Sequence, residues 1–298
     1  MISANALTKY FTRDRAALSE VSFAVAEGEI CGLLGHNGAG KSTVLGIMLG
    51  MVKPSSGEVM VAGHSVQKNR ASALRQVGAI FEAPSFYEYM TGWQNLKTLC
   101  AFSGWWEEKE VKRVLDVVNL SHRVHAKVRT YSHGMRQRLA LAQALLPMPK
   151  VLLLDEPTDG LDPEGIHEFR STVLNLRKQH GLTILLNSHL LAEVEQMCDR
   201  CVILREGTKV YEGPVKSTDA EKPLFELKTP DLELAQNTAR SMGLTLGADG
   251  MVELPGRHHG PQCITALVHA GVRVEAWVPR HKTLEDVYLE LNPSAVRP

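Results

Sequence analysis

Short, continuous runs of apolar residues recur along the first 218 residues of the chain, with amphipathic segments between them. Four of these runs have the length of a buried strand, and they cover residues 29–35, 151–155, 183–187 and 201–204. Continuous apolar strands that alternate with helices are typical of a parallel sheet covered on both faces. The pattern therefore predicts an α/β domain over residues 1–218.

One part of this domain has helical spacing and no strand-like run. Apolar residues recur there at intervals of three and four, at Val111, Val114, Leu115 and Val118. This spacing places them on one face of a helix. A further helix is expected from Met135 to Leu146, stopped by Pro147. We therefore expect a helical insertion over about residues 88–147.

The pattern of apolar and polar residues changes after a polar break at residues 219–223. The pattern over residues 223–298 predicts a small α+β domain of ferredoxin-like type. The expected elements are a strand at 224–228, a helix at 232–242, short strands near Leu244 and Val252, a helix at 264–270, a strand at 272–278, and a last helix with Leu284, Val287, Tyr288 and Leu291 on one face. No pattern in this domain indicates chemistry of its own.

Composition and charge exclude several classes of protein. The chain has 298 residues, 44% hydrophobic and 22% charged, which is typical of a globular protein. Its apolar runs fall short of the roughly 18 residues that span a bilayer, and the N-terminus shows no signal peptide. We therefore expect a cytosolic chain unless a membrane partner holds it. The 33 basic and 33 acidic residues cancel, unlike the charge balance of a nucleic-acid binder.

The five cysteines are expected to be reduced thiols. Cys198 and Cys201 have the spacing of a redox or zinc pair, but no second pair follows at metal-binding distance. We interpret them as small apolar residues at a helix-to-strand junction.

A glycine-rich loop directly follows the first apolar run. Residues 35–43 fit the pattern G-x-x-x-x-G-K-[ST], and a helix is expected to start near Lys41. Glycines let backbone N–H groups close around phosphate oxygens, and the helix points its positive end at the same phosphates. Lys41 would bridge the β- and γ-phosphates, and Ser42 would bind Mg²⁺. The binding residues expected here are Gly35, Asn37, Gly38, Gly40, Lys41, Ser42 and Thr43.

Two carboxylates follow the second apolar run, which ends in Asp155 and is succeeded by Glu156. Ligands of open parallel sheets bind at the carboxyl ends of the strands. Asp155 is therefore expected to complete the Mg²⁺ shell, and Glu156 to polarise an attacking water.

The glycine-rich loop alone is compatible with kinases, GTPases and motor ATPases. A second helix start helps to distinguish among these classes. The chain lacks the Asn-Lys-x-Asp element of GTPases. Ser132 and Gly134 lie at the start of the helix expected from Met135 to Leu146, and they form another phosphate-binding terminus. One chain does not need two such termini for one γ-phosphate, whereas two chains facing head to tail would use one from each.

In order and spacing, these motifs resemble those of the nucleotide-binding subunits of ATP-binding cassette (ABC) transporters, over residues 1 to about 218. The resemblance implies a P-loop NTPase (ABC ATPase) fold, ATP and Mg²⁺ as cofactors, and a dimer in which Ser132 and Gly134 meet the ATP of the other chain. It further implies that Glu156 is the catalytic base and that His189 is the switch histidine. Asp162 would lie in the D-loop, and Phe11, or its neighbour Tyr10, would stack on adenine.

The resemblance also implies partners and a location. A homodimer would drive a separate integral membrane permease from the inner face of the cell membrane, and the permease rather than this chain would contact the cargo. The stretch from Ile80 to Pro84, followed by the aromatic residues Phe86, Tyr87 and Tyr89, resembles the bacitracin, lantibiotic and drug-exporter branch, which favours export. The aromatic loop would receive the permease's coupling helix.

The chain departs from the family pattern at several motif positions. Tyr131, His133 and Met135 replace three residues of the signature Leu-Ser-Gly-Gly-Gln, and Asp159 replaces a common D-loop serine. Glu82 stands where the family carries a glutamine that senses Mg²⁺.

A soluble ABC ATPase acting on nucleic acid or the ribosome is the alternative hypothesis. The single cassette, the lack of a coiled coil and the lack of a basic patch argue against it.

Overall fold

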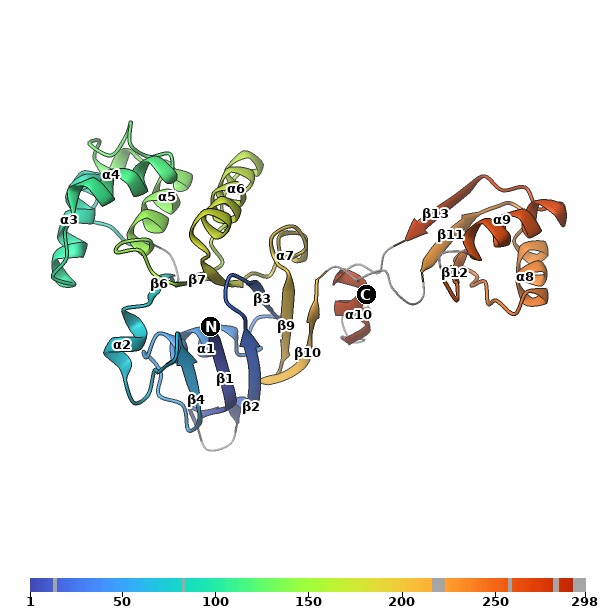
Figure 1. Ribbon diagram of the computed structural model, residues 1–298, viewed down its shortest axis with the longest axis horizontal. Helices are drawn as coiled ribbons and strands as arrows, with labels where there is room; N and C mark the ends of the chain where they lie inside the picture. Colours follow the sequence, from blue (N-terminus) through green and yellow to red (C-terminus); the bar gives the residue numbers. More distant parts are fainter. Residues whose placement is uncertain (13–14, 82–83, 216–222, 257–258, 281–283, 292–298) are drawn as a thin grey trace. The chain divides into compact units, whose positions relative to one another are not determined.

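The computed structural model describes residues 1–12, 15–81, 84–215, 223–256, 259–280 and 284–291. The chain divides into two compact units, Met1–Gly213 and Pro214–Pro298 (Figure 1), and each is described by itself. Residues 219–222 of the expected polar break lie outside the described residues. Within the described ranges, no helix combines the length and the apolar character needed to cross a membrane.

The first unit is built around a sheet whose central strands run parallel. In the described part of the chain this sheet has six strands in the order β10-β9-β3-β8-β7-β6. The strands are β3 (Ile30–Leu34), β6 (Val77–Ile80), β7 (Val151–Asp155), β8 (Thr183–Asn187), β9 (Arg200–Arg205) and β10 (Thr208–Pro214). The pairs β3–β8, β3–β9, β6–β7 and β7–β8 are parallel. All residues of β3, β7 and β8 are buried, which confirms the expected sheet covered on both faces.

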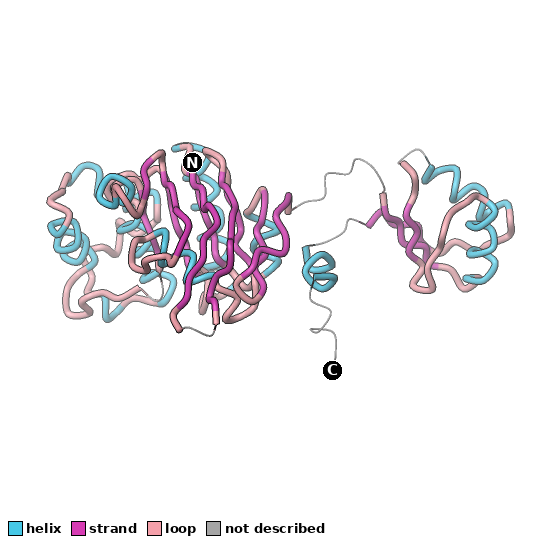
Figure 2. The backbone as a smooth tube through the Cα atoms, turned by 90° about the horizontal axis from the view of Figure 1, so that it is seen from below, coloured by secondary structure: helices cyan, strands magenta, loops and turns pink. Residues whose placement is uncertain are grey.

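A second sheet, which the sequence analysis did not predict, lies in the same unit. Its strand order is β2-β1-β4-β5, and the strands are β1 (Ile2–Tyr10), β2 (Ala16–Val25), β4 (Ser56–Val61) and β5 (His64–Ser65). Figure 2 shows the long strands of this sheet side by side. Register shifts interrupt the pairing of β1 with β2, and Ala6 has a φ of +45°. These irregularities break the alternation by which half-buried strands are usually recognised.

Helices connect and cover the two sheets. They are α1 (Lys41–Met48), α2 (Arg70–Leu74), α3 (Gly92–Phe102), α4 (Glu108–Val117), the short 3₁₀ helix η1 (Val128–Thr130), α5 (His133–Ala144), α6 (Pro163–His180) and α7 (Leu191–Met197). Helix α1 packs against β2 and β4 of one sheet and against β7 of the other, which joins them in one hydrophobic core.

The helical insertion forms, and both ends of its last helix are corrected. Helices α3, α4 and α5 gather at one side of the unit, away from β1, β2 and β4 (Figure 1). Helix α5 begins at His133 rather than Met135, because Ser132 is its N-cap and accepts a hydrogen bond from the backbone N–H of Met135 at 3.3 Å. It ends at Ala144 rather than Leu146.

The second unit is a small α+β fold. Its elements are β11 (Leu224–Lys228), α8 (Leu232–Ser241), β12 (Met251–Glu253), α9 (His259–His269), β13 (Ala276–Arg280) and α10 (Leu284–Leu291). The described strands pair antiparallel in the order β12-β11-β13. The strand expected near Leu244 is reduced to a bridge between Leu246 and Val252, because Gly243 and Gly247 leave only three residues between them. Helix α9 starts earlier and β13 starts later than expected.

Candidate nucleotide site

The glycine-rich loop joins the C-terminal end of β3 to the start of α1. Gly35, Gly38 and Gly40 have φ values of +151°, +82° and +107°, a backbone region that side chains disfavour. A Cβ at Gly35 would overlap the carbonyl oxygen of Leu204, whereas Gly38 faces open space. The loop therefore needs glycine for its shape, and at Gly38 its backbone is open to an approaching ligand.

Lys41 is buried at the start of α1, and its ammonium donates to the carbonyl oxygen of Gly35 at 2.7 Å. Burial lowers the pKa of this ammonium, and the nearby carboxylates of Glu156 and Asp155 act in the opposite direction. A hollow of about 420 Å³ lies beside it. The lining residues are Ala17, Asn37, Gly38, Gly40, Lys41, Ser42, Thr43, Asp155, Glu156 and Asn187.

Asp155 ends β7 beside Asn187, which ends β8, and the two residues are paired in the parallel ladder. The side-chain amide of Asn187 donates to the Asp155 carboxylate, while the amide oxygen Oδ1 is buried with no hydrogen-bond partner among the described residues. The hollow is thus lined by Ser42, which carries a hydroxyl, and by Asp155, which carries a carboxylate. Oxygen donors of this kind fit Mg²⁺.

Glu156 and His189 face each other at the same edge of the sheet. The imidazole Nδ1 of His189 lies 2.7 Å from Oε2 of Glu156, and the backbone N–H of His189 donates to the same oxygen at 3.2 Å. Glu156 has a φ of +45°, and its backbone N–H donates to the carbonyl oxygen of Asn187. A strained non-glycine residue of this kind is typical of functional sites.

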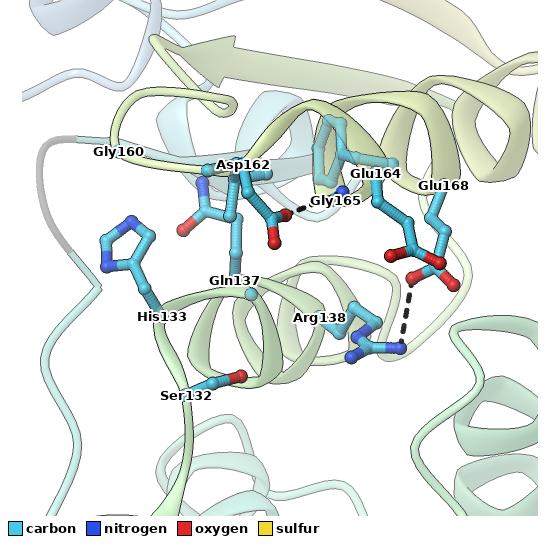
Figure 3. A pocket seen from close by; sticks show the side chains of 12 residues that line it. Ser132, His133, Gln137, Arg138, Gly160, Asp162, Glu164, Gly165 and Glu168 are labelled. Atoms are coloured by element: carbon cyan, nitrogen blue, oxygen red, sulfur yellow. Dashed lines mark hydrogen bonds and ion pairs between the residues drawn. The ribbon is translucent and has the colours of Figure 1, made fainter.

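Ser132 and Gly134 lie at a different hollow, of about 400 Å³, between the starts of α5 and α6. Figure 3 shows this hollow with His133 and Gln137 of α5 on the side toward Gly160 and Asp162, and with Ser132 at the N-terminal end of that helix. Asp162 is the N-cap of α6 and accepts from the backbone N–H of Gly165 at 2.8 Å. No residue is shared between this hollow and the one beside Lys41.

Helix α5 also holds the segment that follows Glu156. The imidazole Nε2 of His133 lies 2.9 Å from the carbonyl oxygen of Asp159, and the amide of Gln137 donates to the carbonyl oxygen of Pro157. The departures from the family pattern at His133 and Asp159 thus meet in one contact. Tyr131 is buried, its hydroxyl donates to the carbonyl oxygen of Arg123 at 2.9 Å, and burial raises its pKa.

The remaining expected residues do not join the hollow beside Lys41. Phe11 is 63% exposed and does not line it, although the Lys9 ammonium lies 4.9 Å from its ring centroid. Glu82 lies outside the described residues. Conversely, sequence reasoning missed Ala17 and Asn187 as lining residues. The position of Asn187 at the carboxyl end of a parallel strand was a usable signal.

The cysteine pair is buried and free. Cys31, Cys198 and Cys201 meet around Gly32, where a Cβ would approach Cys198 Sγ to 3.4 Å and Cys201 Cβ to 3.5 Å. Burial raises the pKa of the Cys201 thiol to about 12 and raises those of Cys31 and Cys198 as well. Among the described residues, no group of histidine, cysteine and carboxylate side chains suits a metal ion. These thiols pack as apolar side chains.

Comparisons with known proteins agree with this arrangement. The family described as ABC transporter matches residues 18–159. The chain is 38% identical to the uncharacterized ABC transporter ATP-binding protein YhcH of Bacillus subtilis (strain 168) over 283 residues, 94% of this chain and 92% of that protein. This chain belongs to the ABC transporter ATP-binding proteins.

Other relatives of this ABC ATPase extend the likeness. The chain is 39% identical to the bacitracin transport ATP-binding protein BcrA of Bacillus licheniformis, over 72% of this chain and 70% of that protein. It also resembles the dimeric structure of MJ0796, a bacterial ABC transporter cassette, with 25% identity and a TM-score of 0.65, over 73% of this chain and 100% of that one. The expected P-loop NTPase fold is confirmed, and this ABC ATPase is an ATP hydrolase of the transport-coupled kind.

Proposed function

We propose that two copies of this chain bind two ATP molecules head to tail, hydrolyse them with Mg²⁺, and thereby drive a separate integral membrane permease. The proposal of a dimer rests on one observation, which is that the two hollows are separate. Lys41 and the glycine loop line one, Ser132 and Gly134 line the other, and no residue is common to both. A nucleotide that needs both phosphate-binding helix starts would take one from each chain.

Within each site, the backbone N–H groups of the loop and Lys41 bind the phosphates, and Thr43 lies beside them. Phe11, or its neighbour Tyr10, stacks on adenine from an exposed position on the same unit. Ser42 and Asp155, which both line the hollow, hold Mg²⁺. When bound, Mg²⁺ neutralises phosphate charge and acts as a Lewis acid. The part proposed for Glu82, a carboxylate in place of the family's Mg²⁺-sensing glutamine, rests on the sequence, because this residue lies outside the described residues.

Glu156 acts as the general base that takes a proton from the attacking water. His189, in hydrogen-bond contact with Glu156, holds the base and contributes a ring nitrogen toward the γ-phosphate. Ser132 and Gly134 of the partner chain complete the site, and Asp162 in the D-loop lies beside them. Glu156 and His189 already contact each other within one chain, and groups positioned before the reaction are the usual source of catalytic electrostatic stabilisation.

The permease docks on the aromatic loop before α3 and keeps the chain at the inner face of the cell membrane. Tyr87 and Tyr89 are 43% and 66% exposed, although large aromatic side chains usually seek burial. Aromatic residues are enriched at protein interfaces. Export is the direction favoured by the likeness to the bacitracin transport protein. The permease contacts the cargo, and this chain does not.

The test is an affinity purification of the tagged Glu156→Gln variant from detergent-solubilised native membranes in the presence of ATP. We expect a multi-spanning protein in stoichiometric amount with two copies of this chain. A double variant, Tyr87→Ser with Tyr89→Ser, should retain ATP-driven dimerisation and lose the membrane protein. Recovery of the chain alone, or with ribosomes or DNA-bound proteins, would overturn the proposal in favour of a soluble ATPase acting on nucleic acid.

A further inference from the structure

Glu193, on α7, is a buried carboxylate that the proposed chemistry does not use. The residue is 6% exposed. Its Oε2 atom accepts hydrogen bonds from the hydroxyls of Thr158, at 2.6 Å, and Ser188, at 3.1 Å. Its Oε1 atom is buried without a hydrogen-bond partner in the described part of the chain. Glu193 is thus incompletely compensated in the interior of the first unit.

Such a residue is poorly explained by stability alone. Burying a carboxylate is costly unless it is fully paired, and apolar side chains of similar size often serve a fold as well or better. The neighbours of Glu193 on α7, Val194 and Met197, are buried apolar residues, so the surroundings would accept another one. The carboxylate is therefore best explained by what its two hydrogen bonds hold.

The two hydroxyls belong to the two loops that carry the proposed catalytic pair. Thr158 lies two residues after Glu156, and Ser188 immediately precedes His189. The Ser188 hydroxyl also accepts from the backbone N–H of Leu190 at 3.1 Å, so both sides of His189 are tied to one point. The carboxylate of Glu193 is the shared acceptor that joins these loops.

We propose that Glu193 is a positioning residue that sets the distance between Glu156 and His189. The inference rests on the proposed roles of that pair. Glu193 does not line the hollow beside Lys41, and it acts through Thr158 and Ser188. Because the Glu156–His189 contact is 2.7 Å, a small displacement of either loop separates the two side chains. Misplacement of catalytic groups by about 1 Å can cost about 100-fold in rate.

The experiment compares Glu193→Leu, Glu193→Gln and the triple variant Thr158→Val, Ser188→Ala, Glu193→Leu in the full chain. The triple variant replaces the polar group by apolar side chains and leaves no buried hydroxyl unpaired, so it should fold even if Glu193→Leu does not. Gln196→Leu, at an exposed position of the same helix, is the matched control. The readouts are thermal unfolding, ATP affinity, kcat, and the imidazole NMR signal of His189, assigned by its loss in His189→Gln.

We expect the Leu and triple variants to bind ATP as the wild type does, to lose about tenfold or more in kcat, and to shift the His189 signal. Glu193→Gln retains a carbonyl acceptor and should recover most of the rate. Wild-type turnover in the triple variant, an unshifted His189 signal, or a kcat loss matched by an equal loss of ATP affinity would overturn the proposal. If the wild type itself fails to hydrolyse ATP, the proposed function fails, while the His189 signal still decides whether Glu193 positions that residue.

Discussion

The imidazole Nδ1 of His189 lies 2.7 Å from the carboxylate Oε2 of Glu156, although the two residues are 33 positions apart in the chain. The contact follows from the parallel pairing of β7 with β8, in which Asp155 lies opposite Asn187. Each of the two residues follows the carboxyl end of its strand, where the sheet delivers functional groups. The Glu156 carboxylate and the His189 imidazole are thus brought together because β7 and β8 are neighbouring strands.

Glu156→Gln is expected to remove most of the ATP hydrolysis while ATP binding persists. The amide keeps the shape of the side chain but cannot accept the proton of the attacking water. We expect kcat to fall by about 100-fold or more, measured by phosphate release. Glu27→Gln, an exposed residue in the turn before β3, makes the same change at the opposite edge of the sheet and should leave the rate unaltered. A normal rate in purified Glu156→Gln protein would show that another group is the base.

Gly78→Ala is expected to destabilise the first unit through the helix that carries Ser132. Gly78 lies in β6, and a Cβ there would overlap the carbonyl oxygen of Ala144 in α5 and come within 3.0 Å of Pro149 Cγ. Overpacking of this kind costs about 1–3 kcal/mol, which urea unfolding of the first unit measures. Gly256→Ala, in the second unit, meets its nearest atom at 3.7 Å and should leave that transition unchanged. Equal unfolding free energies for wild type and Gly78→Ala would contradict the packing described.

The cysteines of the native protein are expected to resist thiol reagents at pH 8. All five are buried, and the pKa of Cys201 is raised to about 12 by burial. A raised thiol pKa means that the reactive thiolate is scarce at pH 8. Titration with a chromogenic disulfide should therefore detect no thiol in the native chain and all five after denaturation with guanidinium chloride. Rapid labelling of Cys198 or Cys201 in the native protein would instead favour a redox or metal role for the pair.

The second unit contains an ion pair with a defined pH dependence. Arg273 donates to both carboxylate oxygens of Asp231 at 2.7 and 2.9 Å, and this lowers the pKa of Asp231 from 3.8 to about 2. Because the folded-state pKa is depressed, the pair stabilises the unit above about pH 4, and the stabilisation is lost as the pH falls through about 2. Carbon-13 NMR titration of the Asp231 carboxyl should report this pKa directly.

Arg273→Gln should return the pKa of Asp231 toward its ordinary value, because the guanidinium is the main cause of the depression. The difference in unfolding free energy between wild type and variant should be present at neutral pH and vanish near pH 2. Arg240→Gln, at an exposed position in the last turn of α8, is the control for loss of one positive charge. An Asp231 pKa that does not move in Arg273→Gln would refute the assignment.

The sequence alone was sufficient to predict the central strands and the position of the glycine-rich loop. The apolar runs at β7 and β8 are buried on both faces, so their composition is continuous and their bounds could be predicted to the residue. The glycine loop before α1 could also be predicted from the sequence, because its conformation requires glycine at defined positions. In both cases the physical cause, burial of a strand or the conformation of a loop, acts on consecutive residues and can therefore be recognised in a short stretch of sequence.

The tertiary structure decided what depends on pairing between distant segments. The sheet containing β1, β2 and β4 has register shifts that hide its alternation, so its strands are defined by their partners. The contacts of His133 with Asp159 and of Glu193 with Thr158 join segments that are 26 and 35 residues apart in sequence. Hydrogen bonds of this kind depend on which strands are neighbours and on where each helix begins. These hydrogen bonds cannot be predicted from the periodicity of a single segment, because they form only when the folded chain brings the segments together.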